Sequence, residues 1–479
     1  MARQLSKKEV NEIGRRHYRW REMSLFIIPF AILMLEMFQL PLAQQYRDSI
    51  TIGADKILFG AHSFPTADDL IPIIGFIAAV VGVHIVLTIF FPKSDQMLFP
   101  IVAFLSGLGV LLAIRNGPDV STGSEPDLGI KQLEWVLIGL VACLGVLFGL
   151  RNMNWLKRYK YTWAVIGLIL VGFTLASAFR VNLDSPTHDQ LNLGPFKLQP
   201  SELLKIVIVV FFAGYLSENR DVLAQGSIRL GPLHLPPLRQ LGPLILMLCV
   251  ALALFLGVRE LGLAMLIYSI FLSMLYLGSG KPSYMIGGMI AFLALGFIGY
   301  SLFSYVRSRF TAVGIDMVNW QNWDDQTITL IHSSGLQIAQ GLIAISSGGI
   351  LGAGFGLGHA SGLVPVAQSD MVLTVIAEEL GLTGLFAIIG LYVFLLYRGF
   401  RIAIEARDPF QKLLASGLTS IFGIQTLIIS AGNLKLLPLT GIPLPFLSYG
   451  GSSVIANFII IGLLLRISHT TALEREGLA

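Results

Sequence analysis

The sequence of 479 residues has little charge. Asp, Glu, Lys and Arg together make up 13% of it, whereas 54% of it is hydrophobic. A soluble globular domain carries about 25% charged residues, so the low charge excludes an ordinary soluble enzyme with one hidden core. Together with a mean hydropathy of +0.74, it indicates an all-α polytopic protein that crosses a membrane many times.

Motifs for disulfides, metals and nucleotides are also missing. The two cysteines, Cys143 and Cys249, lie in apolar runs without CxxC spacing, and the eight histidines form no HExxH pattern. The glycines of GILGAGFGLGHASG, residues 349–362, fit neither the Walker pattern nor GxGxxG between a strand and a helix. We therefore expect no dedicated zinc site and no nucleotide. The net charge of +4 is explained by an excess of Lys and Arg in segments expected on one side of the membrane, as described below. No nucleic acid partner is therefore expected.

Long apolar runs are what the sequence does have. A spanning helix needs roughly 20 apolar residues, and the sequence predicts about twelve such helices. The first 23 residues are basic and lack a small-residue cleavage site, which indicates a retained first helix. The predicted spans are 24–43, 68–91, 99–115, 133–150, 161–179, 203–217, 241–256, 261–278, 284–303, 372–397, 413–431 and 450–467.

An even number of spans places both termini on one side of the membrane. Segments on that side hold roughly twice as many Lys and Arg residues as the opposite segments, so we expect cytoplasmic termini. The longest connection, 304–371, then lies outside the cell. Within it, GLQIAQGLIAISSGGIL, residues 335–351, is too broken by Gly and Ser to span, and we expect it to lie on the surface or to be re-entrant. If it spans, the basic loop 398–412 faces outward, against the charge rule.

Three carboxylates occur in GLVPVAQSDMVLTVIAEELGLTG, residues 362–384. Asp370 begins a predicted helix, where a carboxylate either caps free backbone N–H groups or serves in a site. Glu378 and Glu379 fall within an apolar run, where charge is costly and usually faces a bundle interior. They either pair with a basic residue on another helix or take part directly in catalysis.

Basic groups occur in two further segments. In LGPFKLQPSELLKIV, residues 193–207, Glu202 and Lys205 are three residues apart on one helix face and can form an ion pair. The pair either neutralises two costly charges or offers an ammonium to a diphosphate. Arg307 and Arg309 in SYVRSRF are either exposed loop charges or phosphate clamps.

Small residues occur at a helix start in LLPLTGIPLPFLSYGGSSVIANF, residues 436–458. Ser452 and Ser453 follow two glycines there. They either permit close helix packing or line the site of a lipid-linked substrate.

Four motifs in this order carry a family resemblance. GPFKLQPSELLK, SSGGILGAGFG, SDMVLTVIAEELGLTG and PLTGIPLPFLSYGGSS resemble the shape, elongation, division and sporulation (SEDS) family, which includes RodA and FtsW, over about residues 99–467. The resemblance implies a ten-helix core. It divides the chain into an N-terminal segment with two extra helices (1–98), the core (99–467) and a cytoplasmic tail (468–479).

The resemblance also implies a function. Members of the family polymerise lipid II into peptidoglycan at the outer face of the cytoplasmic membrane, for cell elongation or division. They use an undecaprenyl-linked glycan and work with a class B penicillin-binding transpeptidase. Asp370 matches the family's essential acidic residue, and Glu202 and Lys205 match its PSE helix. The sequence departs from the family where Val366 follows Pro365 and where Glu260 begins Glu-Leu-Gly-Leu.

The expected reaction suits these residues. Joining an α-linked lipid diphosphate sugar to a hydroxyl with β stereochemistry is one inversion, which needs a base at the hydroxyl and positive charge at the diphosphate. Asp370 is the expected base, or it holds a divalent cation, Mg or Mn, that neutralises the diphosphate. The alternative is a lipid II flippase, although a carrier places its site near the midplane and the polar residues here gather toward one side.

Overall fold

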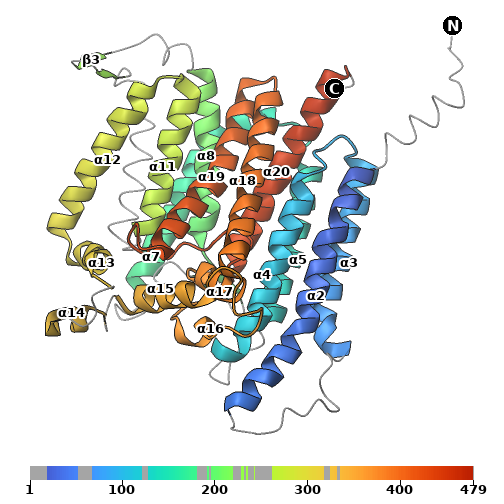
Figure 1. Ribbon diagram of the computed structural model, residues 1–479. Coiled ribbons are helices and arrows are strands. Elements are labelled where there is room, and N and C mark those ends of the chain that lie inside the picture. The colour runs from blue at the N-terminus through green and yellow to red at the C-terminus, as the bar shows by residue number, and fades with distance from the viewer. Residues whose placement is uncertain are drawn as a thin grey trace, which may run out of the picture.

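The computed structural model describes residues 19–51, 67–120, 128–180, 191–193, 196–219, 228–230, 233–235, 242, 261–317, 324–331 and 335–477. Most of these residues are helical (Figure 1). The long helices are α2 (Trp20–Thr51), α3 (Ala67–Phe90), α4 (Leu98–Val120), α5 (Leu128–Gly149), α7 (Lys160–Arg180), α8 (Pro200–Glu218), α11 (Leu261–Ser279), α12 (Pro282–Leu302), α18 (Gly381–Glu405), α19 (Pro409–Asn433) and α20 (Gly451–Arg475). The short ones are α6 (Asn154–Arg158), α13 (Ser304–Gly314), α14 (Asp325–Leu330), α15 (Leu336–Gly348), α16 (Ala360–Leu363) and α17 (Val372–Glu379).

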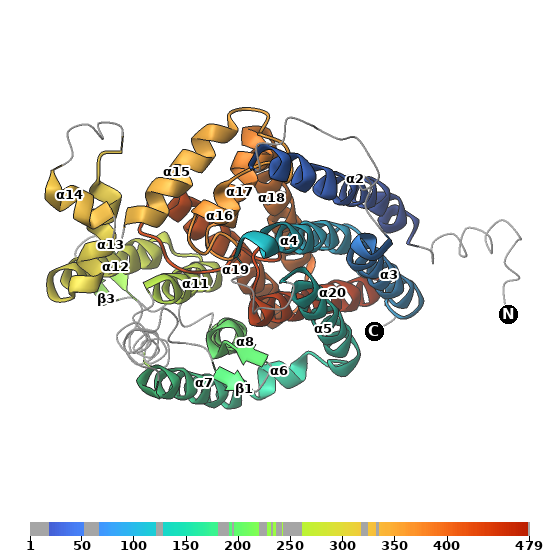
Figure 2. The ribbon, with the colours of Figure 1, turned by 90° about the horizontal axis from the view of Figure 1, so that it is seen from below.

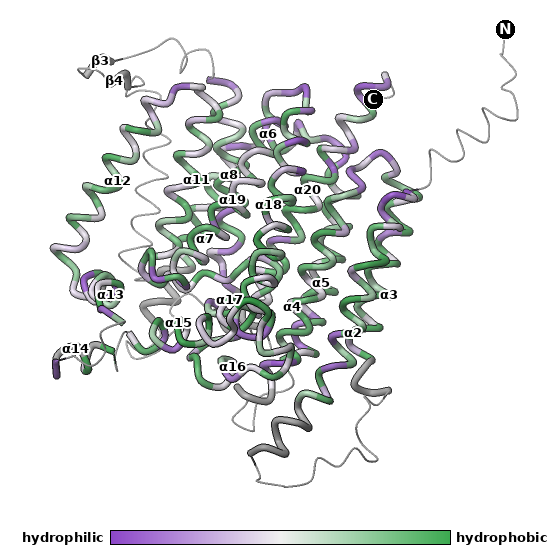
Figure 3. Tube along the Cα trace, viewed as in Figure 1, coloured by the Kyte–Doolittle hydropathy of each residue, from purple (hydrophilic) through white to green (hydrophobic). Residues whose placement is uncertain are grey.

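The long helices form a membrane-spanning bundle. Within the described residues, 10 helices are long and apolar enough to cross a membrane, and Lys160–Phe173 of α7 is a shorter apolar stretch. These helices and α7 account for every expected span except 241–256, which lies outside the described residues apart from position 242, so the total of about twelve stays a prediction. Hydropathy is highest along the bundle, and polar residues gather toward its two ends (Figure 3).

Burial separates the centre of the bundle from its rim. Almost every residue of α8 is buried, because α7, α11, α19 and α20 pack around it. In α12 only Tyr284 and Gly299 are buried, although the helix is as apolar. An apolar face left exposed in this way suits lipid, which solvates it without penalty.

The two ends of the bundle differ. The start of α2 and the end of α20 lie at one end, here called the C-terminal end, while α13, α14, α15 and α16 lie at the opposite end, here called the loop end (Figure 1). The connection 304–371 thus holds short helices rather than an irregular loop. Helix α15 has 13 residues, too few to span, in agreement with the prediction for this segment.

The predicted helix 372–397 is wrong as a single element. The chain forms α17, breaks at Leu380 and Gly381, and continues as α18 to Glu405. Gly381 has φ +67°, which only glycine adopts readily, and a Cβ there would meet the backbone N of Gly352 at 2.3 Å. The apolar pattern continues through the break, so hydropathy alone did not reveal it.

Two small hairpins interrupt the predicted all-helical chain. Strand β1 (Leu191–Leu193) pairs with β2 (Phe196–Leu198), and β3 (Ile228–Leu230) pairs with β4 (Leu233–Leu235), both antiparallel. The β3–β4 hairpin lies at the C-terminal end (Figure 1). Both connect helices and leave the helical bundle intact.

The N-terminal helices α2 and α3 are packed against the rest of the bundle, beside α4 and α5 (Figure 2). At the C-terminal end, buried Arg19 pairs with Glu22 and donates to the carbonyls of Ser94 (2.9 Å) and Asp95 (2.8 Å). Asp95 in turn pairs with Arg398 at the same end. The separation of 1–98 from 99–467 as two units stays a prediction.

Candidate active site

Asp370 lies at the loop end, in the turn that leads into α17. The residue at the N-cap of α17 is Met371, so Asp370 does not act as the simple cap that the sequence left open. Its carboxylate accepts a hydrogen bond from Ser369 Oγ at 3.0 Å, and the side chain is only partly accessible. Removal from solvent raises the pKa of the Asp370 carboxyl above its ordinary value, and hydrogen bonds from Ser369 and Gln337 and the charge of Arg309 oppose the shift only in part.

The backbone around Asp370 is fixed by residues far along the chain. Asn433 Nδ2 at the end of α19 donates to the Asp370 carbonyl at 3.0 Å. The Tyr449 amide donates to the Gln368 carbonyl at 2.8 Å, and Ser448 Oγ donates to the Ser369 carbonyl. The motif around Ser448 therefore holds the Asp370 turn in place.

The turn also contains a strained residue. Val366 has φ +58°, which is an unfavourable conformation for a β-branched side chain. Strain of this kind gathers at functional sites, where the surrounding contacts are strong enough to maintain it. The position of Val366, four residues before Asp370, is consistent with a functional turn.

Glu378 and Glu379 hold the glycine-rich segment that precedes this turn. Glu378 accepts from the backbone amides of His359 (3.1 Å) and Ala360 (2.7 Å), and Glu379 accepts from the amide of Gly356 (3.0 Å). Both glutamates are buried in α17, before the span α18 begins, and not in the middle of a span as the hydropathy suggested. Their contacts favour a structural role over direct catalysis.

Arg115 supports the glycine-rich segment near the candidate site, and the sequence patterns did not single it out. It lies near the end of α4, is fully buried, and contacts Glu379 Oε1 at 3.0 Å and the Gly358 carbonyl at 2.6 Å. The sequence signal was an arginine at the end of an apolar span, because such a charge usually finds a partner. Its partner, 264 positions away, was visible only in the structure.

Glu202 and Lys205 form the expected ion pair on α8. Lys205 Nζ lies 2.6 Å from Glu202 Oε2, and it also donates to Gln425 Oε1 (3.2 Å) and Asn457 Oδ1 (3.4 Å). Lys205 is 1% exposed. The pair is thus part of a buried network that joins α8, α19 and α20, and Lys205 is not an open ammonium in this structure.

The small residues at the start of α20 permit close packing. A Cβ on Gly451 would lie 2.3 Å from the Trp135 ring of α5. Ser452 Oγ accepts from the Gln199 amide at 2.9 Å, and Ser453 Oγ accepts from Asn457 Nδ2 at 3.5 Å. Both serines are buried and connect α20 to the start of α8 and to the Lys205 network.

The two arginines of α13 differ in their surroundings. Arg307 donates to the Ser301 carbonyl at 3.0 Å and lies over the Tyr300 ring. Arg309 donates to the Leu439 carbonyl at 2.8 Å, and its charge acts on Asp370. Of the two predicted clamps, only Arg309 is near enough for its charge to lower the pKa of Asp370, and this effect is smaller than those of the hydrogen bonds.

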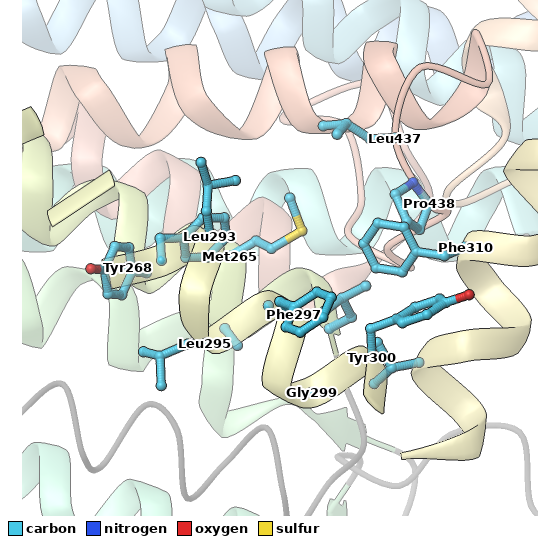
Figure 4. Close-up of a pocket in the computed structure, with 15 residues that line it drawn as sticks. Met265, Tyr268, Leu293, Leu295, Phe297, Gly299, Tyr300, Phe310, Leu437 and Pro438 are labelled. Atoms are coloured by element: carbon cyan, nitrogen blue, oxygen red, sulfur yellow. The ribbon is translucent and has the colours of Figure 1, made fainter. Parts of the chain in front are cut away.

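An apolar cavity of about 390 Å³ is lined in part by Phe310, the residue that follows Arg309 on α13. It is bounded by α11, α12, α13 and the segment after α19. Figure 4 shows the Phe310 and Tyr300 rings near Pro438, with Leu437 close by. Leu437 and Pro438 line the cavity, and the next residue, Leu439, accepts the hydrogen bond from Arg309. The cavity lining therefore includes sequence neighbours of Arg309 and of its hydrogen-bond acceptor Leu439.

The described residues hold no group of three His, Cys, Asp or Glu side chains that could bind a metal ion. Mg²⁺ often uses only one or two carboxylates and completes its shell with water and substrate phosphates. Asp370 fits as one such ligand, and the described part of the protein provides no complete cage around it.

These features define a class: a polytopic membrane protein with a carboxylate site at one end, beside an apolar cavity. A family model described as cell cycle protein, FtsW/RodA/SpoVE, matches residues 95–473. The chain belongs to this family.

The names of similar proteins agree with membership of this family. The chain is 35% identical over 396 residues to peptidoglycan glycosyltransferase RodA of Mycobacterium leprae, covering 81% of this chain and 80% of the relative. It is 34% identical over 276 residues to a probable peptidoglycan glycosyltransferase FtsW of Geobacter metallireducens, covering 57% of this chain and 67% of the relative.

The fold is similar to that of a solved structure described as "Structural coordination of polymerization and crosslinking by a peptidoglycan synthase complex". The TM-score is 0.61 and the sequence identity is 23%, over 79% of this chain and 98% of that chain. Rod shape determining protein RodA of Thermus thermophilus matches with a TM-score of 0.52 and 22% identity, over 78% of this chain and 96% of that chain. At 23% and 22% identity, the similarity to these two structures shows a shared fold only.

Proposed function

We propose that the protein is a peptidoglycan glycosyltransferase that polymerises lipid II into glycan strands. The observation that carries the proposal is the arrangement of Asp370, Arg309 and the apolar cavity. It offers a carboxylate, a cation and a hydrophobic space, which suit the sugar, the diphosphate and the polyprenyl chain of one lipid-linked substrate. The family membership and the names of the relatives support it.

In the proposed reaction, the hydroxyl of the acceptor sugar attacks the anomeric carbon of the donor. The bond from that carbon to the lipid diphosphate breaks, with inversion. Asp370 accepts the hydroxyl proton, and a raised carboxyl pKa makes it a stronger base than an exposed aspartate. Arg309 stabilises the negative charge on the departing diphosphate. Arg307 lies on the same short helix α13, and a role for it in binding the substrate stays a prediction.

The remaining predicted residues support this site in the proposal. Glu378 and Glu379 hold the glycine-rich segment, while Glu202, Lys205, Ser452 and Ser453 keep α8, α19 and α20 together. A divalent cation, Mg or Mn, would be held by Asp370 and the substrate diphosphate and would neutralise negative charge there.

We place the protein in the cytoplasmic membrane with both termini in the cytoplasm and the loop end outside. The excess of Lys and Arg in the segments expected at the C-terminal end supports this orientation. The site then faces the compartment in which glycan strands are assembled. The proposed partner is a class B penicillin-binding transpeptidase, because a structural relative is described as coordinating polymerization with crosslinking.

A lipid II flippase is the second candidate from the sequence. The polar groups around Asp370 gather at the loop end, whereas a carrier needs its site near the midplane. This position favours the transferase.

The experiment is Asp370→Asn in purified protein, assayed for glycan formation from lipid II with and without the transpeptidase. General base catalysis contributes typically 10²–10⁴-fold, so turnover should fall by at least about 100-fold. The thermal melting temperature should stay at or above that of the parent at neutral pH, because a carboxyl with a raised pKa destabilises the folded state when it ionises.

The pH profile supplies a second check. The parent rate should fall with decreasing pH, beginning above the ordinary carboxyl pKa, because the base must be ionised. The residual rate of Asp370→Asn should lack this step. A variant that polymerises lipid II at the parent rate would show that Asp370 is not the base, and a parent protein that makes no glycan would reject the function itself.

A further inference from the structure

Several buried polar atoms in the last eight residues of α19, 426–433, and in the Asp370 turn have no hydrogen-bond partner among the described residues. They are Oε1 of Gln368, Oγ1 of Thr426, Oγ of Ser430 and Oδ1 of Asn433. Such atoms are rare in folded proteins, because leaving one unsatisfied costs about 1–3 kcal/mol. A cluster of such atoms indicates a site where a bound ligand supplies the missing hydrogen bonds.

Three of these residues lie on one face of α19. Thr426, Ser430 and Asn433 are spaced by four and three residues, which places their side chains above one another. We call these three residues the α19 stripe. It ends at Asp370, because Asn433 Nδ2 donates to the Asp370 carbonyl at 3.0 Å. Thr426 is 8% exposed and Asn433 is 2% exposed.

The hydrogen bonds of Asn433 fix which of its atoms is free. Its Nδ2 donates to the carbonyls of Asp370 and Ile429, so Oδ1 must point the other way. Gln368, two residues before Asp370, likewise offers its Oε1. Carbonyl oxygens only accept hydrogen bonds, and hydroxyls accept or donate. Asn433 contacts the backbone of Asp370, and Gln368 lies in the same turn, so these acceptor atoms lie near the residue that carries the proposed base.

An acceptor-rich surface selects its ligand. A diphosphate also has only acceptors and would be repelled by the two amide oxygens of Gln368 and Asn433, whereas sugar hydroxyls and N-acetyl N–H groups donate to these oxygens and can also bond the two hydroxyls. We propose that the α19 stripe and Gln368 bind the N-acetylated sugar that carries the attacking hydroxyl, next to Asp370. The stripe thereby separates the acceptor sugar from the diphosphate of the donor, which lies on the side of Arg309. This inference rests on the proposed function.

The test uses two lipid II analogues that separate the two substrates. One has the configuration of its 4-hydroxyl inverted, so that it serves only as donor. The other has a single phosphate, which is a poor leaving group, so that it serves only as acceptor. Coupling of the two is measured with one substrate varied and the other saturating, for the parent, Ser430→Ala and Thr426→Val.

Each lost hydrogen bond should raise the KM for the acceptor analogue about two- to tenfold, with the KM for the donor analogue unchanged. Thermal melting should be unchanged or higher, since each substitution removes an unsatisfied polar atom. Ser416→Ala is the matched control, because the Ser416 hydroxyl donates to the Lys412 carbonyl of its own helix at 2.8 Å. It should leave both KM values at the parent level.

An unchanged acceptor KM in both variants would overturn the proposal, and so would a rise confined to the donor KM. If one variant does not fold, the other tests the same stripe. Failure of the parent to couple the analogues and to polymerise lipid II would instead count against the proposed function.

Discussion

The buried ion pair between Arg115 and Glu379 gives the strongest prediction about how the site is held. Arg115 on α4 is 0% exposed in its side chain and Glu379 on α17 is 1% exposed. Removing one partner of such a pair typically costs about 3–5 kcal/mol, because the other charge stays buried and alone. Arg115→Met should therefore be severely destabilising, since it also removes the hydrogen bond to the Gly358 carbonyl.

Glu379→Gln tests the same pair from the other side. Glutamine keeps an oxygen for the Gly356 amide, which now bonds Glu379 Oε2 at 3.0 Å, but it removes the carboxylate charge that contacts Arg115 Nε. The double variant Arg115→Met with Glu379→Gln removes both charges, so it should be less destabilised than the sum of the two single variants by about 1–3 kcal/mol.

The measurement is a double-mutant cycle on unfolding in detergent, with lipid II polymerisation measured in parallel. Arg401→Met with Glu405→Gln is the control cycle, because that pair is exposed and should contribute below about 1 kcal/mol. Additive effects of Arg115→Met and Glu379→Gln would refute the idea that their charges depend on each other. Full activity of both single variants would show that the glycine-rich segment does not position Asp370.

Two further predictions concern the Lys205 network and the topology. Lys205→Met or Glu202→Gln alone should lower the melting temperature more than the double variant, because a lone buried charge is costly; a double variant as unstable as the sum would reject a mainly electrostatic pair. For the topology, a cysteine at Asp324 should react with a membrane-impermeant thiol reagent added outside cells, whereas a cysteine at Arg407 should react only after permeabilisation. The opposite labelling pattern would invert the proposed orientation.

The sequence alone determined the class of fold and much of the site's position. Spans follow from apolar runs that match the membrane's thickness, so all but 241–256 could be located on described helices. Asp370 and the Glu202–Lys205 pair were found because an acidic residue at a helix start and an i, i+3 pair are local patterns. The contact between Lys205 Nζ and Glu202 Oε2, 2.6 Å in the structure, could be predicted from the spacing of residues along a helix.

The sequence did not reveal what depends on contacts between distant segments. It could not separate Arg309 from Arg307, because the difference arises from the Leu439 carbonyl, 130 residues away. It gave no role to Arg115, and it treated Glu379 as a residue inside a span. The helix break at Gly381 was also missed, because its cause is the close approach of the segment around Gly352.

The division has a physical reason. Hydrophobic runs and helix periodicity depend only on residues that are close together in the sequence. The sequence by itself therefore specified which segments cross the membrane and which residues share a helix face. The environment of a buried charge or amide depends on which helices pack beside it. Only the tertiary structure brought Asn433, Tyr449 and Ser448 to the Asp370 turn and set Arg115 against Glu379.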